Sequence, residues 1–99
     1  MHARTGTIHA SPDKIDDVLR QVEQETVPRY RDQSGYKGFT LLADRQSGKM
    51  IGVSFWESES DLEASDELGK QARESAAQTG GGGGDTVREV FEVLLDDMA

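Results

Sequence analysis

The feature that most limits the fold of this chain is the run from residue 50 to residue 56, which ends in its only tryptophan. Successive side chains of an extended strand point to opposite faces. One face therefore carries the bulky apolar residues Ile51, Val53 and Phe55. The other face is small or polar up to the tryptophan, and it carries Met50, Gly52, Ser54 and Trp56. A helix packed over this second face cannot fill all the space, so the run predicts a cavity between strand and helix.

Charge and composition limit the partners that the chain can have. It contains 19 acidic and 11 basic residues, which gives a formal net charge of −8. Nucleic acids and anionic membranes would repel such a chain, and no basic patch offsets this. Cysteine is absent, so disulfides and cysteine metal sites are excluded. The sequence shows neither a run of about 18 apolar residues nor a signal peptide, and we therefore expect a cytoplasmic protein that does not enter a membrane.

The length of 99 residues predicts one domain over residues 1–99. Only 34% of the residues are hydrophobic, yet the predicted strands carry apolar side chains on both faces. A second copy of the chain would cover the face that the helices leave open. We therefore expect a homodimer.

The first third of the chain predicts a strand followed by a helix. Residues 2–10 are rich in threonine and free of proline, as is typical of a strand. Ser11 is expected to cap the following helix through its side chain. Apolar residues recur at helical spacing up to about Thr26, and Pro28 is expected to disturb the last turn. A polar connection that includes Tyr30 then covers residues 29–35.

The other predicted elements follow in order: a strand at 36–44, a turn at 45–48, the strand that contains residues 50–56, a helix to about residue 77, a flexible glycine loop at 80–84 and a strand at 86–95. The turn contains Gly48, so its two flanking strands are expected to form a hairpin. Either Ser58 or Ser60 can cap the second helix.

The resulting order, βαββαβ, predicts an α+β, ferredoxin-like fold with a four-stranded antiparallel sheet and both helices on one face. The face that carries Ile51, Val53 and Phe55 then points away from the helices. We expect two such faces to pack together, which would form a dimeric α/β barrel.

The segment Val53-Ser54-Phe55-Trp56-Glu57-Ser58-Glu59-Ser60-Asp61-Leu62, preceded by the hairpin at Ser47-Gly48, resembles the strand-to-helix signature of the antibiotic biosynthesis monooxygenase family. The resemblance implies a homodimer with one pocket per subunit between helices and sheet. Some members oxidise polycyclic phenols with oxygen and need neither metal nor flavin. Other members bind and degrade heme.

The resemblance also assigns individual positions. Trp56 matches the tryptophan that lines the pocket of the phenol-oxidising members. Their asparagine and tyrosine would fall at Gly52 and Leu62, so neither is retained. Their pocket arginine has a shifted counterpart in Arg73, which could hold a phenolate or carboxylate or lie exposed on its helix.

The heme-degrading members differ more strongly from this chain. Their asparagine, tryptophan and histidine would fall near Thr5, Ser65 and Ser75. None of the three is retained, so heme degradation by that mechanism is not expected.

Several further residues have a functional and a purely structural interpretation. Trp56 is either a wall that stacks on an aromatic ligand or a core aromatic residue. Thr5, Thr7 and Ser54 are either hydroxyl donors into the pocket or ordinary strand residues. His9 could act as a base, although no acid or nucleophile is spaced to pair with it.

Two functional hypotheses follow. The first is a cofactor-independent, monooxygenase-like protein that acts on a small aromatic or quinol-type substrate. In this first hypothesis the Trp56 ring forms the wall of the pocket that stacks on the substrate. The other proposed site residues are Arg73, His9, Thr5, Thr7, Gly52, Ser54 and Leu62. The alternative is a non-catalytic dimeric module that binds a small apolar ligand. We expect no cofactor, and no metal site, because the acidic residues do not converge with histidine.

Overall fold

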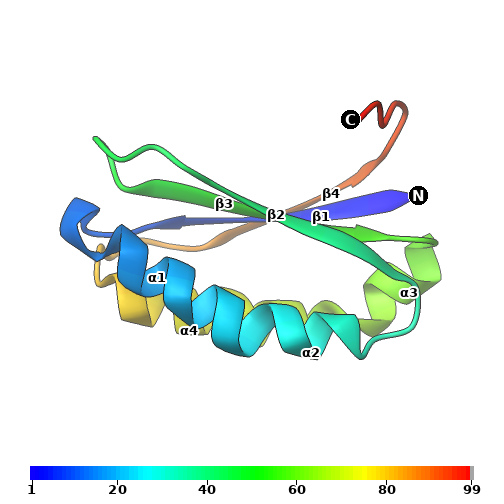
Figure 1. Ribbon diagram of the computed structural model, residues 1–99, viewed down its shortest axis with the longest axis horizontal. Coiled ribbons are helices and arrows are strands. Elements are labelled where there is room, and N and C mark those ends of the chain that lie inside the picture. Colours follow the sequence, from blue (N-terminus) through cyan, green and yellow to red (C-terminus); the bar gives the residue numbers. More distant parts are fainter. Residues whose placement is uncertain (99) are drawn as a thin grey trace.

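The computed structural model describes residues 1–98. Four antiparallel strands form one sheet, and all the helices lie on the same face of it (Figure 1). The strands are β1 (His2–His9), β2 (Tyr36–Ala43), β3 (Lys49–Trp56) and β4 (Val87–Glu92), in the spatial order β2-β3-β1-β4. The predicted α+β, ferredoxin-like order and the β2–β3 hairpin are therefore confirmed.

The central strand β3 separates its residues between two environments, as the sequence predicts. Met50, Ser54 and Trp56 face the helices and are at most 2% exposed. The alternate residues Ile51, Val53 and Phe55 are half-buried on the outer face. The pairing of β1 with β3 sets Arg4 opposite Ser54. Because opposite residues of an antiparallel pair share a face, this register turns Arg4 toward the helices.

The first helical region is longer than the sequence predicts. A 3₁₀ turn (Pro12–Lys14) leads into α1 (Ile15–Gln21), a π-helical segment (Val22–Thr26) and α2 (Val27–Arg31). Pro28 thus lies inside the helix rather than ending it. The wider π turn before it relieves the clash between the proline ring and the preceding turn.

Two predictions about the first helical region, one for Tyr30 and one for Ser11, are wrong. Tyr30 belongs to α2 and not to a polar connection. Ser11 does not cap the helix with its side chain; instead its backbone carbonyl accepts the Lys14 N–H.

The second helical region is broken at Ser65, between α3 (Glu59–Ala64) and α4 (Asp66–Gly80). Of the two predicted caps, Ser58 is the one used: its hydroxyl accepts the Asp61 N–H at 3.1 Å. The helix α4 continues to Gly80 and closes on Gly81, whose φ of 63° suits glycine. The expected flexible loop therefore does not include the first residues of the glycine run.

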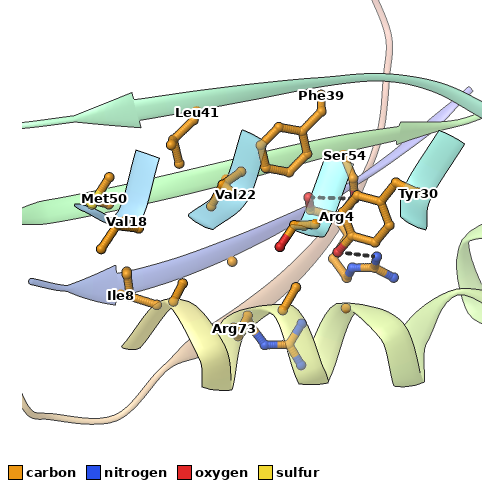
Figure 2. Close-up of a pocket in the computed structure, with 16 residues that line it drawn as sticks. Arg4, Ile8, Val18, Val22, Tyr30, Phe39, Leu41, Met50, Ser54 and Arg73 are labelled. Atoms are coloured by element: carbon orange, nitrogen blue, oxygen red, sulfur yellow. Dashed lines mark hydrogen bonds between the residues drawn. The ribbon is translucent and has the colours of Figure 1, made fainter. Parts of the chain in front are cut away.

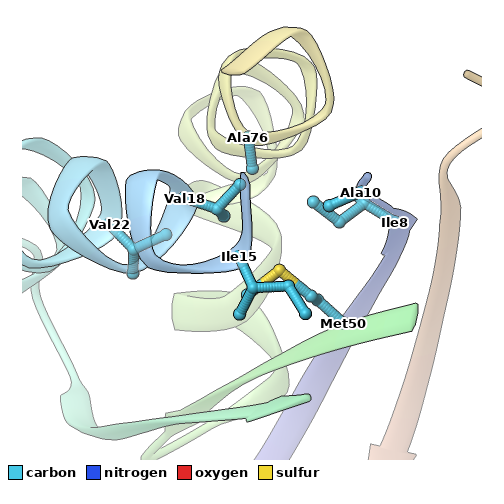
Figure 3. Packing of buried hydrophobic residues seen from close by; sticks show 7 residues of the cluster. All are labelled: Ile8, Ala10, Ile15, Val18, Val22, Met50 and Ala76. Atoms are coloured by element: carbon cyan, nitrogen blue, oxygen red, sulfur yellow. The ribbon is translucent and has the colours of Figure 1, made fainter. Parts of the chain in front are cut away.

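Two apolar clusters fill the space between helices and sheet. One lies between α1, α4 and the ends of β1 and β3 (Figure 3), and its buried members are Ile8, Ala10, Ile15, Val18, Val22, Met50 and Ala76. The other is aromatic and centres on Trp56, whose ring meets those of Tyr30 and Tyr36 edge-on at 5.6 and 5.7 Å. Burial raises the pKa of the Tyr36 phenol, which keeps it neutral at physiological pH.

A buried arginine joins β1 to the break between α3 and α4. Arg4 is 2% exposed, and its Nη1 donates to the Leu62 carbonyl at 3.2 Å, the Ser65 hydroxyl at 3.0 Å and the Asp66 carboxylate at 2.9 Å. The Leu62 carbonyl lies in the last turn of α3, where it also accepts from the Ser65 N–H at 3.1 Å and from the Ser65 hydroxyl at 2.7 Å.

Gly69 allows α4 to approach this arginine closely. A Cβ atom at Gly69 would lie 2.6 Å from Cζ of Arg4, which is closer than two carbon atoms can approach. Glycine within a helix costs about 1 kcal/mol relative to alanine. The close approach explains why the helix tolerates glycine at this position.

After β4 the chain leaves the sheet, so the predicted last strand is shorter than expected. Residues 93–98 lie on the face of the sheet away from the helices (Figure 1). They border a groove of about 370 Å³ over Gly38, Thr40 and Phe55. We call this the outer groove.

The Gly69→Ala variant tests the socket of Arg4. We expect its free energy of unfolding to fall by about 2 kcal/mol, because the added methyl group displaces the guanidinium from its acceptors. In an Arg4→Leu background the same change should stabilise by about 1 kcal/mol, since only the helix propensity remains. Urea unfolding of the four proteins, followed by circular dichroism, measures both effects. Equal effects in the two backgrounds would contradict this account.

Candidate functional site

A cavity of about 50 Å³ lies between the sheet and the helices (Figure 2). Its floor comes from alternate residues of the two central strands, Arg4, Gly6, Ile8, Met50, Gly52 and Ser54. Phe39 and Leu41 of β2 close one side. Its roof includes Val18, Val22, Thr26 and Tyr30 from the first helical region and Gly69, Ala72, Arg73 and Ala76 from α4. We call this space the cavity.

Glycines in the floor make room for two large side chains. A Cβ atom at Gly6 would lie 3.0 Å from the Arg73 side chain, and one at Gly52 would lie 3.0 Å from the Phe39 ring. The small face of β3 thus leaves space between the sheet and the helices. Arg73 and Phe39 occupy part of that space, and this keeps the cavity small.

Three of the predicted site residues meet in this cavity: Gly52, Ser54 and Arg73. Trp56 and Leu62 are fully buried beside it but do not contribute to its lining. The Trp56 indole donates to the Ser54 hydroxyl at 2.9 Å, so its polar group is satisfied within the core. The position of Trp56 therefore agrees with its interpretation as a core aromatic residue.

Thr5, Thr7 and His9 lie away from the cavity. Thr5 pairs with Val53 and Thr7 with Ile51, so both threonines share the outer face with those residues. His9 is exposed at the end of β1. The expectation that these three side chains reach the pocket is not met, because the alternation of β1 turns Arg4, Gly6 and Ile8 inward instead.

The sequence analysis gave no cavity role to two of its polar residues, Arg4 and Thr26, and it placed Tyr30 in a connection rather than on a helix. Arg4 alternates with Ile8 on the inward face of β1, and that spacing was the available signal. Tyr30 continues the series of inward residues Val18, Val22 and Thr26 at steps of four. Pro28 concealed this signal, because it indicated that the helix had already ended.

Positive charge gathers at the α4 side of the cavity, in a chain whose net charge is −8. The Asp66 carboxylate pairs with both Arg4 and Arg88, each at 2.9 Å. Arg73 makes no side-chain hydrogen bond or ion pair with any residue in the range 1–98. Burial lowers the pKa of the Arg73 guanidinium, and the charge of Arg4 lowers it further. An anion in the cavity would relieve both effects.

The lining limits the chemistry of this site. It contains no histidine, aspartate or glutamate, so none of these common general bases faces the cavity. Residues 1–98 hold no group of three side chains suited to bind a metal ion. The lining offers no histidine to ligate a heme iron, because both histidines lie outside the cavity. Within the same residues, no helix has the length and apolar character needed to cross a bilayer.

Two solved structures share this fold at low sequence identity. One is a monooxygenase from the gene ActVA-Orf6 of Streptomyces coelicolor, in complex with the ligand nanaomycin D. It matches with a TM-score of 0.77 and 15% identity over 99% of this chain and 91% of that one. Another is the heme-degrader MhuD of Mycobacterium tuberculosis with two hemes bound in its active site. Its TM-score is 0.73, with 17% identity over 99% of this chain and 100% of that one.

Sequence comparison finds higher identity. The uncharacterized protein Rv2557 of Mycobacterium tuberculosis is 35% identical over 82 residues, which is 83% of this chain and 37% of that protein. Rv2558 of the same organism is 36% identical over 77 residues, or 78% of this chain and 33% of that protein. The chain thus spans about a third of the length of these curated relatives. The model of the family described as antibiotic biosynthesis monooxygenase matches residues 1–76, and the chain belongs to that family.

Proposed function

We propose that this protein is a cofactor-independent, monooxygenase-like enzyme that binds a small aromatic or quinol-type substrate as an anion in the cavity. The observation that carries the proposal is Arg73, a charged lining residue with no hydrogen-bond or ion-pair partner for its side chain among residues 1–98, in an otherwise largely apolar cavity. Arginine binds oxyanions through a rigid, permanently charged fork. Apolar neighbours such as Val22 and Phe39 suit the ring of the substrate.

The lack of an acid or histidine in the lining restricts the substrate class. The substrate must ionise with little help, as an anthrone-like or quinol compound does, and the protein then mainly stabilises and orients the anion. The anion passes an electron to O₂, and the resulting radical and superoxide combine to a hydroperoxide on carbon. With an anthrone-like substrate, loss of water from it leaves a carbonyl group, so a CH₂ group and O₂ become C=O and H₂O. A quinol has no CH₂ group; it passes a second electron and its protons to superoxide, so the quinol and O₂ become the quinone and H₂O₂.

The size of the cavity means that a substrate must displace side chains. About 50 Å³ is too small for an aromatic ring, but Phe39 and Arg73 fill space above Gly52 and Gly6. Rotation of either side chain away from its glycine enlarges the cavity without moving the backbone. Side-chain rotation of this kind is common when proteins bind partners.

The alternative function is binding of a small aromatic ligand without turnover. The lining contains no histidine, aspartate or glutamate that could remove a proton from a weakly acidic substrate. For such compounds this favours binding over catalysis. Oxygen uptake distinguishes the two functions, because only the enzyme consumes O₂.

Replacing Arg73 with glutamine tests the enzymatic proposal. Wild-type protein should increase O₂ uptake above the protein-free rate with anthrone or with naphthoquinol, measured with an oxygen electrode. We expect Arg73→Gln to reduce kcat/KM by about 100-fold, because the transition-state anion loses its counter-charge. Lys70→Gln, an exposed change of the same charge on α4, is the matched control and should retain full activity.

Two results would count against the enzyme. Equal rates for wild type and Arg73→Gln would remove Arg73 from the reaction. Aromatic ligands that bind and cause no O₂ uptake would leave the binding module as the function.

We propose further that two copies of the chain pack through the outer faces of their sheets, as a dimeric α/β barrel. Ile51, Val53 and Phe55 are half-buried there, and Phe91 and Leu42 are each 50% exposed. The tail after β4 adds Leu95, which is 85% exposed and borders the outer groove. Apolar surface of this kind is typical of an interface between subunits.

The Val53→Asp variant tests this interface. A carboxylate in the middle of the packed faces would be buried without a partner, so we expect monomers or loss of folding. Phe91→Asp adds a charge at a half-exposed site, which a folded monomer tolerates, and it should give soluble monomers. Leu19→Asp on α1 is the control for an apolar-to-acid change away from the interface and should remain dimeric. Sedimentation velocity measures all four proteins, and a soluble dimeric Val53→Asp variant or a monomeric wild type would refute the interface.

A further inference from the structure

One hydroxyl group at the cavity is held by a buried cation. Tyr30 is 3% exposed, and its phenol oxygen accepts a hydrogen bond of 3.3 Å from Nη2 of Arg4 (Figure 2). A phenol also has one hydrogen to donate, and no side chain or backbone group within residues 1–98 accepts it. Because Tyr30 lines the cavity, this hydrogen is available to a ligand there.

The cation itself is fixed in place. The other terminal nitrogen of Arg4 donates to Leu62, Ser65 and Asp66, so the guanidinium is held on the side away from Tyr30 as well. Its Cζ lies 5.7 Å from the ring centroids of both Tyr30 and Trp56. A hydroxyl that accepts a hydrogen bond from a cation is polarised, and it becomes a stronger donor in turn.

The tyrosine ring is also fixed before any ligand arrives. Its centroid lies 5.6 Å from that of Trp56, 5.9 Å from that of Phe39 and 6.3 Å from that of Tyr36. These contacts leave the phenol oxygen little freedom to move. A donor held in place by packing loses little entropy when it binds a ligand.

We propose that Tyr30 donates its hydroxyl hydrogen to the charged oxygen of a phenolate or enolate ligand, with Arg4 positioning the tyrosine and Arg73 supplying the free positive charge. The Tyr30 hydroxyl and the charge of Arg73 together suit an anion that bears its charge on a single oxygen. This inference rests on the proposed function, because it places the same anion in the same cavity. It adds the residue that recognises the oxygen and the class of oxygen that it recognises.

Binding of 4-nitrophenol tests the inference, because its visible spectrum reports both its ionisation and the hydrogen bonding of its phenolate. The Tyr30→Phe variant removes the hydroxyl and keeps the ring. We expect it to bind nitrophenolate at least about tenfold more weakly. The ionisation midpoint of the bound probe should rise, and its phenolate band should move to longer wavelength, since the anion loses a donor.

The neighbouring Tyr36 offers a matched control. Tyr36→Phe makes the same chemical change on a ring that stacks on Tyr30 but does not line the cavity. It should change neither the affinity nor the spectrum of the bound probe. Thermal unfolding of each variant, recorded without the probe, shows separately how much each hydroxyl contributes to stability.

The outcomes distinguish this inference from the proposed function. If nitrophenolate binding depends on Arg73, as tested with Arg73→Gln, but Tyr30→Phe binds like wild type, the role of Tyr30 is overturned and the anion site stands. A loss of stability in Tyr30→Phe with an unchanged probe spectrum also overturns it, because the hydroxyl is then only structural. A wild-type protein that binds no nitrophenolate overturns both proposals.

Discussion

The buried guanidinium of Arg4 is the interaction on which the rest of this structure depends. A charge with 2% exposure is stable only when several acceptors surround it, and here they come from the break between α3 and α4. The Leu62 carbonyl and the Ser65 hydroxyl lie at this break and accept from Arg4, and Gly69 lets α4 approach the planar group. The same side chain then reaches Tyr30 on the other helical region. Arg4 thus ties β1 to both helical regions, and it lines the cavity between them.

The charges around Arg4 explain why the cavity is suited to an anion. Asp66 is shared between Arg4 and Arg88, so one carboxylate offsets two guanidinium groups. Arg73 is left without a partner among the described residues. The surface of the chain is strongly acidic, and this excess of positive charge is therefore local to the cavity. A ligand that brings a negative charge completes the arrangement, which is the physical basis for the proposed substrate class.

The glycines of the sheet determine how much space the cavity has. Gly6 and Gly52 lie on the two central strands, and each is covered by a movable side chain rather than by backbone. Space above the floor can therefore open by side-chain rotation.

The sequence by itself determined the order of elements, the hairpin at residues 45–48 and the two faces of β3, because the period of two and the turn chemistry are local properties. It also determined the family, through the segment around Trp56. Only the tertiary structure decided which face of β1 meets the helices, since this depends on register with β3: it turns Arg4 inward and Thr5 outward. It likewise decided that the helix continues past Pro28 and brings Tyr30 to the cavity. Local spacing was compatible with both positions, but contacts between distant segments decided them.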